Sequence, residues 1–192
     1  MKPIRSVWPL LLSVPAPAFA HTGLHPGGSF FAGLLHPLSG VDHLLVMFSV
    51  GVWAVLVMPR RVWQPAALFV GCLAAGAWLG LHGVPLPATE TGIAASVLVM
   101  GLLLMVWTRI PASPGLAMIA LFAVFHGHAH GLEMPSGGAP AAYAAGFMLA
   151  TAGLHLAGIS LGALAVHWRA QWLLRGAGLA TGVTGAWLLL GA

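Results

Sequence analysis

The sequence predicts an all-α fold, a polytopic bundle of transmembrane helices. Hydrophobic residues make up 59% of the 192 residues, the mean hydropathy is +0.96 and charged residues account for only 5%. An ordinary soluble domain carries roughly 25% charged residues, so the composition favours the bilayer as the solvent. The apolar runs lack the alternation of polar and apolar residues that a membrane β-barrel requires, which indicates helices.

The N-terminus is predicted to be a cleavable signal peptide over residues 1–20. A short basic start precedes the apolar stretch Val7–Phe19, and Ala20 ends a small-x-small pattern typical of a cleavage site. The stretch is too short and too rich in proline to span a bilayer of about 30 Å. Cleavage would leave His21 at the mature N-terminus, where it can bind a metal ion together with His25; a plain flexible start is the alternative.

The remaining residues, 21–192, are predicted to form a single transmembrane domain of about six spans. The first and fifth apolar segments exceed the roughly 20 residues that crossing requires. Pro37 and Gly40 interrupt the first, so we expect a short half-helix or re-entrant piece followed by the true span from about Val41. The six segments run from Ser29 to Val57, Pro65 to Leu81, Thr91 to Trp107, Gly115 to Gly131, Ala141 to His167 and Leu173 to Leu190.

The arginines predict the orientation of these spans. They lie in alternate connections: Arg60 and Arg61 after the first span, Arg109 after the third, and Arg169 and Arg175 around the gap after the fifth. By the positive-inside rule these connections are cytoplasmic. The mature N-terminus and the C-terminus are therefore expected in the periplasm, and the chain in the inner membrane of a bacterium. Scattered arginines of this kind do not predict binding of nucleic acid.

The first polar motif is an acidic residue within an apolar segment. A lone charge at the bilayer centre costs about 3 kcal/mol on insertion scales, so Asp42 needs a partner. His36 and His43 are seven residues apart and share one face of a continuous helix, whereas Asp42 points elsewhere unless Pro37 and Gly40 break the helix. Imidazole and carboxylate groups are suitable ligands for nickel, cobalt or zinc.

The second polar motif lies near the end of the fourth segment. His126 and His130 are four residues apart and face one way on a helix, whereas His128 faces roughly opposite. A lone intramembrane histidine often serves as a helix–helix hydrogen-bonding group. Three imidazoles and the carboxylate of Glu133 within eight residues instead indicate metal contact, although for His128 both readings stay open.

The predicted orientation places both motifs at similar depth near the outer face, where they can meet. His82 and Glu90 lie near the same face, as a solvated loop residue and a carboxylate at a helix N-terminus. His155, in the middle of the fifth span, is either part of an ion path or a packing residue. His167 is expected at the cytoplasmic interface.

Two further features have structural readings. Small-xxx-small pairs predict close helix packing: Gly76 with Gly80, Gly127 with Gly131, Gly158 with Gly162 and Gly178 with Gly182. Five tryptophans are expected to anchor the helices at the inner membrane boundary: Trp53, Trp63, Trp107, Trp168 and Trp172.

The two polar motifs resemble those of the HupE/UreJ family. His36-Pro37-Leu38-Ser39-Gly40-Val41-Asp42-His43 is similar to its His-Pro-x-x-Gly-x-Asp-His motif, and Phe125–Glu133 to its Phe-His-Gly-x-Ala-His-Gly-x-Glu motif, with His128 in a variable position. The resemblance extends over essentially the whole chain. It implies a nickel or cobalt permease that supplies metal for hydrogenase or urease. The metal-contacting positions it carries over are His36, Asp42, His43, His126, His130 and Glu133.

The expected function is therefore secondary uptake of a divalent transition metal, nickel or cobalt first, by a protein that is not an enzyme. The chain has no Gly-x-x-x-x-Gly-Lys-Ser/Thr loop for ATP. The metal is cargo rather than a prosthetic group, the other partner is the lipid bilayer, and a homo-oligomer is compatible with the sequence. The alternatives are an intramembrane metalloenzyme with Asp42 or Glu133 as its base, and a metal- or haem-binding accessory membrane protein.

Overall fold

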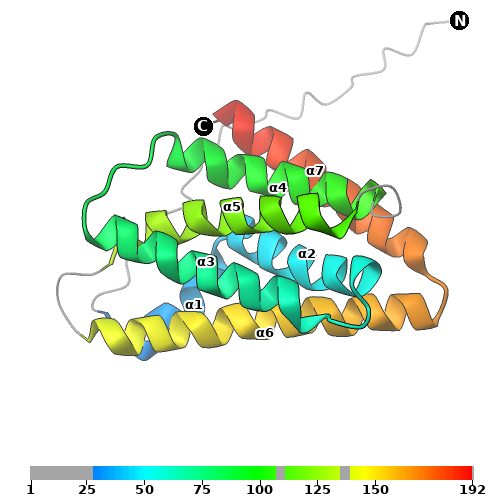
Figure 1. Cartoon of the computed structure of the whole chain (residues 1–192), viewed down its shortest axis with the longest axis horizontal. Helices are drawn as coiled ribbons and strands as arrows, with labels where there is room; N and C mark the ends of the chain where they lie inside the picture. The colour runs from blue at the N-terminus through cyan, green and yellow to red at the C-terminus, as the bar shows by residue number, and fades with distance from the viewer. Residues whose placement is uncertain (1–27, 107–110, 135–138, 192) are drawn as a thin grey trace, which may run out of the picture.

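The computed structural model describes residues 28–106, 111–134 and 139–191, and it is all-helical (Figure 1). Five helices are long and apolar enough to cross a membrane, and the first two helices form a bent pair that counts as a sixth span when taken as one. This confirms the predicted fold class of a multi-pass helical membrane protein. The helices are α1 Phe30–Ser39, α2 Val41–Val57, α3 Trp63–Leu81, α4 Thr89–Val106, α5 Ala112–Leu132, α6 Pro140–His167 and α7 Gln171–Gly191.

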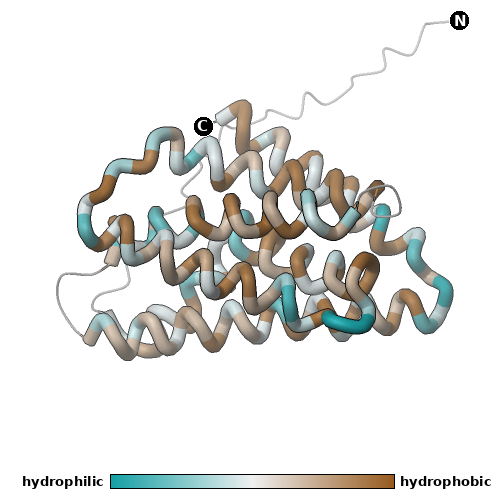
Figure 2. Tube along the Cα trace, viewed as in Figure 1, coloured by the Kyte–Doolittle hydropathy of each residue, from teal (hydrophilic) through white to brown (hydrophobic). Residues whose placement is uncertain are grey.

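Hydrophilic residues gather at the two ends of the bundle, and the long flanks of the helices are mostly apolar (Figure 2). The connections α2–α3 and α6–α7 lie at one end, and the α3–α4 connection lies at the other (Figure 1). The two connections at the first end carry Arg60, Arg61 and Arg169. The chain therefore separates its arginine-bearing turns from the α3–α4 turn, as a multi-pass membrane protein with alternating loops does.

The first span is broken where the sequence predicts. Ser29 caps α1, its Oγ accepting a hydrogen bond from the Ala32 amide at 3.1 Å. The helix then ends at Gly40, whose backbone is extended, and α2 leaves at an angle of 81° to α1. A Cβ on Gly40 would lie 2.8 Å from the Nδ1 atom of His43. Glycine at this corner therefore gives the first turn of α2 room for its polar side chains.

Glycines let α3 and α5 pack with their backbones in contact, as the small-xxx-small pairs predict. A Cβ on Gly76 or Gly80 of α3 would run into a backbone carbonyl of α5. In return, a Cβ on Gly127 or Gly131 of α5 would run into a carbonyl of α3. This reciprocal contact fixes the end of α5 that carries the histidines.

The other two glycine pairs also lie at helix contacts. A Cβ on Gly158 of α6 would meet the backbone of Phe48 on α2, and Gly162 lies against the same helix. Gly178 and Gly182 of α7 lie against α4. All four predicted pairs therefore serve close helix packing.

Gly76→Ala is expected to destabilise the protein by about 1–3 kcal/mol, because the added methyl group forces two backbones apart. Gly71→Ala is the matched control on the same helix, since nothing lies within 4 Å of a Cβ at that position. Thermal unfolding of both variants in detergent measures the difference. Equal midpoints for the two variants would contradict the close packing of α3 on α5.

One tryptophan assignment was wrong. Trp53 is fully buried, with its ring against Gly115 of α5, rather than at the membrane boundary. It is buried because α2 runs through the middle of the bundle, where neighbouring helices cover even its last turns. Trp63, Trp168 and Trp172 are exposed at helix ends, and Trp107 lies outside the described residues.

Candidate metal centre

Three histidines from three different helices converge inside the bundle. His36 comes from the end of α1, His43 from the first turn of α2 and His130 from the last turn of α5. One ring nitrogen from each lies within 4.8 Å of the others, an arrangement able to hold a metal ion. His43 and His130 are buried and His36 is partly exposed. The two sequence motifs therefore meet, as predicted, and they do so through these three imidazoles.

The three imidazole rings lie close enough to coordinate one metal ion together. The centroid of His130 lies 4.8 Å from that of His36 and 4.5 Å from that of His43. The Nε2 atoms of His43 and His130 are 2.5 Å apart. Without a cation one of these nitrogens must donate a proton to the other, whereas around a cation both can present lone pairs. Typical metal–nitrogen distances of about 2.0–2.1 Å would require these two rings to move slightly apart.

The carboxylate of Asp42 orients His43. Its Oδ1 atom accepts hydrogen bonds from the backbone amide of His43 at 2.8 Å and from Nδ1 of the same ring at 2.7 Å. A proton held on Nδ1 leaves Nε2 as the lone-pair nitrogen, directed at His130. This carboxylate–histidine arrangement is typical of metal ligands, because it fixes the tautomer and the orientation of the ring. The break at Gly40 thus turns Asp42 toward its neighbour, as predicted for a broken helix.

His126 lies beside the three-histidine group, one turn earlier on α5. Its ring centroid is 4.8 Å from that of His43, and its Nε2 atom is 2.9 Å from Oγ of Ser96 on α4. The Ser96 hydroxyl donates to the carbonyl of Ile93, so its oxygen accepts the proton of His126 Nε2. Ser96 therefore holds His126 in place next to the group.

His128 faces away from the group, as its spacing predicts. Its Nε2 atom donates to the carbonyl of Val84 at 2.8 Å, and its Nδ1 atom lies 3.3 Å from Oγ1 of Thr89. Both partners belong to the connection between α3 and α4 or to the start of α4. These contacts tie that connection to α5.

The remaining predicted site residues are not members of the three-imidazole group. Glu133 is exposed at the C-cap of α5 and interacts electrostatically with Tyr143, whose ring lies 6.2 Å from that of His36. His155 is buried in α6. His21 and His25 lie outside the described residues.

Aromatic side chains that the sequence did not single out enclose the group. Phe147 of α6 lies 4.4 Å from the ring of His130 and 6.1 Å from that of His36. Tyr143, one turn earlier, contacts His36 from the same helix face. In the sequence, two aromatic residues four apart in an apolar span look like ordinary packing residues. Only their contacts with His36 and His130 show that they line the site. Their apolar rings lower the local dielectric, which strengthens electrostatic interactions inside the site.

The two arginines that follow α2 lie far from this group. Arg60 and Arg61 follow the C-terminal end of α2, whereas Asp42 and His43 open it. The 17 residues of α2 separate them by about 25 Å. The buried carboxylate is therefore not neutralised by an arginine from that turn, and a bound cation could offset its charge.

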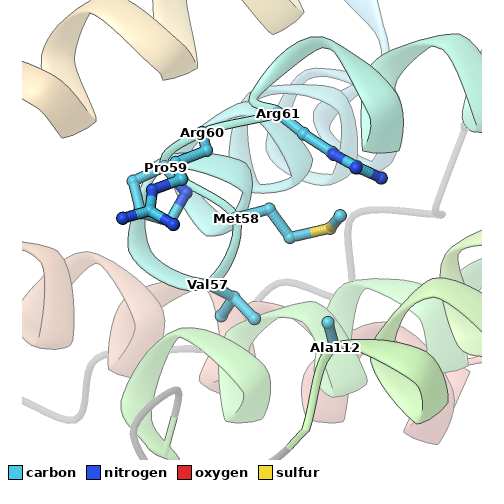
Figure 3. Close-up of a pocket in the computed structure, with 6 residues that line it drawn as sticks. All are labelled: Val57, Met58, Pro59, Arg60, Arg61 and Ala112. Carbon is cyan, nitrogen blue, oxygen red and sulfur yellow. The ribbon is translucent and has the colours of Figure 1, made fainter.

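A pocket of about 540 Å³ lies at the arginine-bearing end. It is lined by Val57, Met58, Pro59, Arg60, Arg61 and Ala112. The two guanidinium groups point to opposite sides of Met58 (Figure 3). Two fixed positive charges disfavour a metal cation, so this pocket is not a candidate metal site.

Comparison with known proteins identifies the family. The family model described as "HupE / UreJ protein" matches residues 9–188. "Protein HupE" from Rhizobium leguminosarum bv. viciae is 42% identical over 180 residues, which cover 94% of each chain. No solved structure matches. Both matches extend over nearly the whole chain and agree with the resemblance carried by the two histidine motifs. The protein belongs to the HupE/UreJ family.

Proposed function

We propose that this protein takes up a divalent transition metal, nickel or cobalt first, through the site formed by His36, His43 and His130 with Asp42 behind it. The observation that carries the proposal is the convergence of three imidazole nitrogens within 4.8 Å inside a multi-pass membrane protein. Ionisable side chains at membrane depth are costly, and they commonly mark ion pathways. Members of the HupE/UreJ family are metal permeases or accessory membrane proteins rather than enzymes, which supports transport over catalysis.

The donor set suits an ion in transit. Three neutral imidazoles and one nearby carboxylate favour nickel, cobalt or zinc over magnesium or calcium, which prefer oxygen ligands. They leave coordination positions for water, so the ion enters and leaves without losing its whole hydration shell. Selectivity among the transition metals then depends on geometry and availability rather than on donor type.

The route follows from the predicted orientation. The ion is captured at the periplasmic face by Glu133, with His21 and His25 as further ligands of the mature N-terminus. It passes to the three-histidine site, with His126 one turn deeper, and leaves toward the arginine-bearing cytoplasmic end. His128 belongs to this route only if its contacts with the α3–α4 connection open. Since the chain has no nucleotide-binding loop, uptake follows the metal gradient or an ion gradient.

Metal uptake into proteoliposomes tests the proposal. Purified protein should carry Ni²⁺ or Co²⁺ into the vesicles with saturation, and parallel assays with Zn²⁺ and Cu²⁺ define the selectivity. Imposing a proton gradient separates coupled from passive transport. Binding without uptake would instead favour an accessory metal-binding protein, a visible haem absorption band would favour a haem protein, and turnover of a peptide or lipid would favour a metalloenzyme.

Acid is expected to weaken metal binding. Each imidazole must be deprotonated to coordinate the ion, so protons compete with the metal at every ligand. Once the imidazoles begin to protonate, the affinity for Ni²⁺ should fall by up to about tenfold per pH unit for each of them. Isothermal titration calorimetry at several pH values measures the slope. A pH-independent affinity would argue that imidazoles are not the ligands.

A further inference from the structure

A second buried histidine lies apart from the three-histidine site. His155 of α6 is only 2% exposed. Its Nδ1 atom lies 2.7 Å from the carbonyl oxygen of Thr151, and a carbonyl only accepts, so Nδ1 carries the proton. The Nε2 atom therefore holds a lone pair. Within the described part of the chain, that buried atom has no hydrogen-bond partner.

His155 lies deeper in the bundle than the three-histidine site. On α6 it follows Phe147, which contacts His130, by eight residues, or about 12 Å of helix. On α2 its backbone carbonyl lies against Gly51, which follows His43 by the same eight residues. Two helices thus give the same separation toward the arginine-bearing end.

One aromatic ring lies near both His155 and the histidine beside the three-histidine site. Phe69 of α3 is fully buried, and its centroid lies 5.1 Å from that of His155 and 6.2 Å from that of His126. The phenyl ring of Phe69 therefore contacts both His126, which lies beside the three-histidine site, and His155.

A packing role explains His155 poorly. Burying a polar atom without a partner costs about 1–3 kcal/mol, and an apolar side chain would avoid that cost. The hydroxyl of Thr151, one turn earlier on the same face of α6, is also buried without a hydrogen-bond partner among the described residues. Two unpartnered polar atoms on one helix face suggest that a polar species, such as an ion or water, contacts them transiently.

We propose that Nε2 of His155 is a second contact point for the metal ion, at which the ion pauses between the three-histidine site and the cytoplasmic end. This inference rests on the proposed transport function. The proton on Nδ1, held by a backbone carbonyl, orients the ring as in known metal-binding histidines. One imidazole with water binds a divalent ion more weakly than three imidazoles do. A weak inner contact lets the ion move on, as conduction requires.

His155→Leu tests the inference in Ni²⁺ uptake by proteoliposomes. The maximal rate should fall at least about tenfold, while the half-saturating concentration, set by the three-histidine site, stays near that of the wild type. His82→Leu is the matched control, since His82 makes the same 2.7 Å contact from Nδ1 to the carbonyl four residues earlier but is exposed at the end of α3. A wild-type maximal rate in His155→Leu would overturn the inference.

Thermal unfolding separates transport from folding. If His155 only packs, His155→Leu should unfold at a lower temperature and transport normally. If it contacts the ion, the variant should be at least as stable as the wild type and transport slowly. Should His155→Leu not fold, His155→Gln replaces it, with the same expected loss of rate and the same overturning result. Absence of uptake of Ni²⁺, Co²⁺, Zn²⁺ and Cu²⁺ alike by the wild type would refute the proposed function itself, whereas uptake unaffected by His155→Leu would refute only this second contact.

Discussion

His130→Ala is expected to abolish measurable Ni²⁺ binding and to lower uptake at limiting Ni²⁺ by at least about 100-fold. Loss of residues that merely support metal ligands typically costs 10–100-fold in affinity, and a direct ligand should cost no less. His130 is the most informative of the three, because its ring lies within 5 Å of the rings of both His36 and His43. Removing it leaves two imidazoles on the broken first span alone. Isothermal titration calorimetry in detergent and proteoliposome uptake measure the two effects.

His167→Ala is the control for this variant. His167 is the last residue of α6 and is exposed. Like His130→Ala, this variant removes one histidine from the protein. It should bind and transport Ni²⁺ as the wild type does. Retained Ni²⁺ binding in His130→Ala would contradict the three-histidine site. A parallel His128→Ala variant shows whether the histidine bonded to Val84 also meets the ion.

Sequence spacing predicted which residues share a helix face, but not which faces meet. The i, i+4 spacing placed His126 and His130 together and turned His128 away, and the structure agrees. Spacing alone treats His126 and His130 as equivalent. The 81° bend at Gly40 and the close packing of α3 on α5 decide that His130 meets His36 and His43, while His126 meets Ser96.

Burial is similarly a property of the assembled helices rather than of one segment. Trp53 lies near the predicted inner end of its span, where tryptophan commonly marks the interface, yet α2 is surrounded by other helices and the ring is fully buried. Tyr143 and Phe147 gave no signal in the sequence because aromatic residues are ordinary in an apolar span. Their importance depends on α6 lying against α1, a contact between segments about 110 residues apart.

Asp42→Asn is expected to weaken Ni²⁺ binding by about 10–100-fold while leaving the metal-free protein at least as stable. The amide has nearly the shape of the carboxylate but no charge, so it neither attracts the cation nor holds the proton firmly on Nδ1 of His43. Thermal unfolding with and without Ni²⁺ reports both effects together, because a ligand that binds only the folded state stabilises it by RT ln(1 + [L]/Kd). The wild type should gain thermal stability from Ni²⁺, and Asp42→Asn should gain much less. A normal Ni²⁺-induced shift in this variant would contradict a role for the carboxylate.

A double-mutant cycle then distinguishes how Asp42 acts. Its Oδ1 atom contacts the backbone and ring of His43, so the carboxylate should act mainly through that imidazole. Once His43→Ala has removed the ring, adding Asp42→Asn should change Ni²⁺ affinity by a much smaller factor than in the wild-type background. If Asp42→Asn instead keeps its full effect without His43, the carboxylate interacts with the ion directly. In that case the coordination sphere contains an oxygen ligand from the first turn of α2, and the tilt of α2 at Gly40 serves to deliver the carboxylate rather than to orient a histidine.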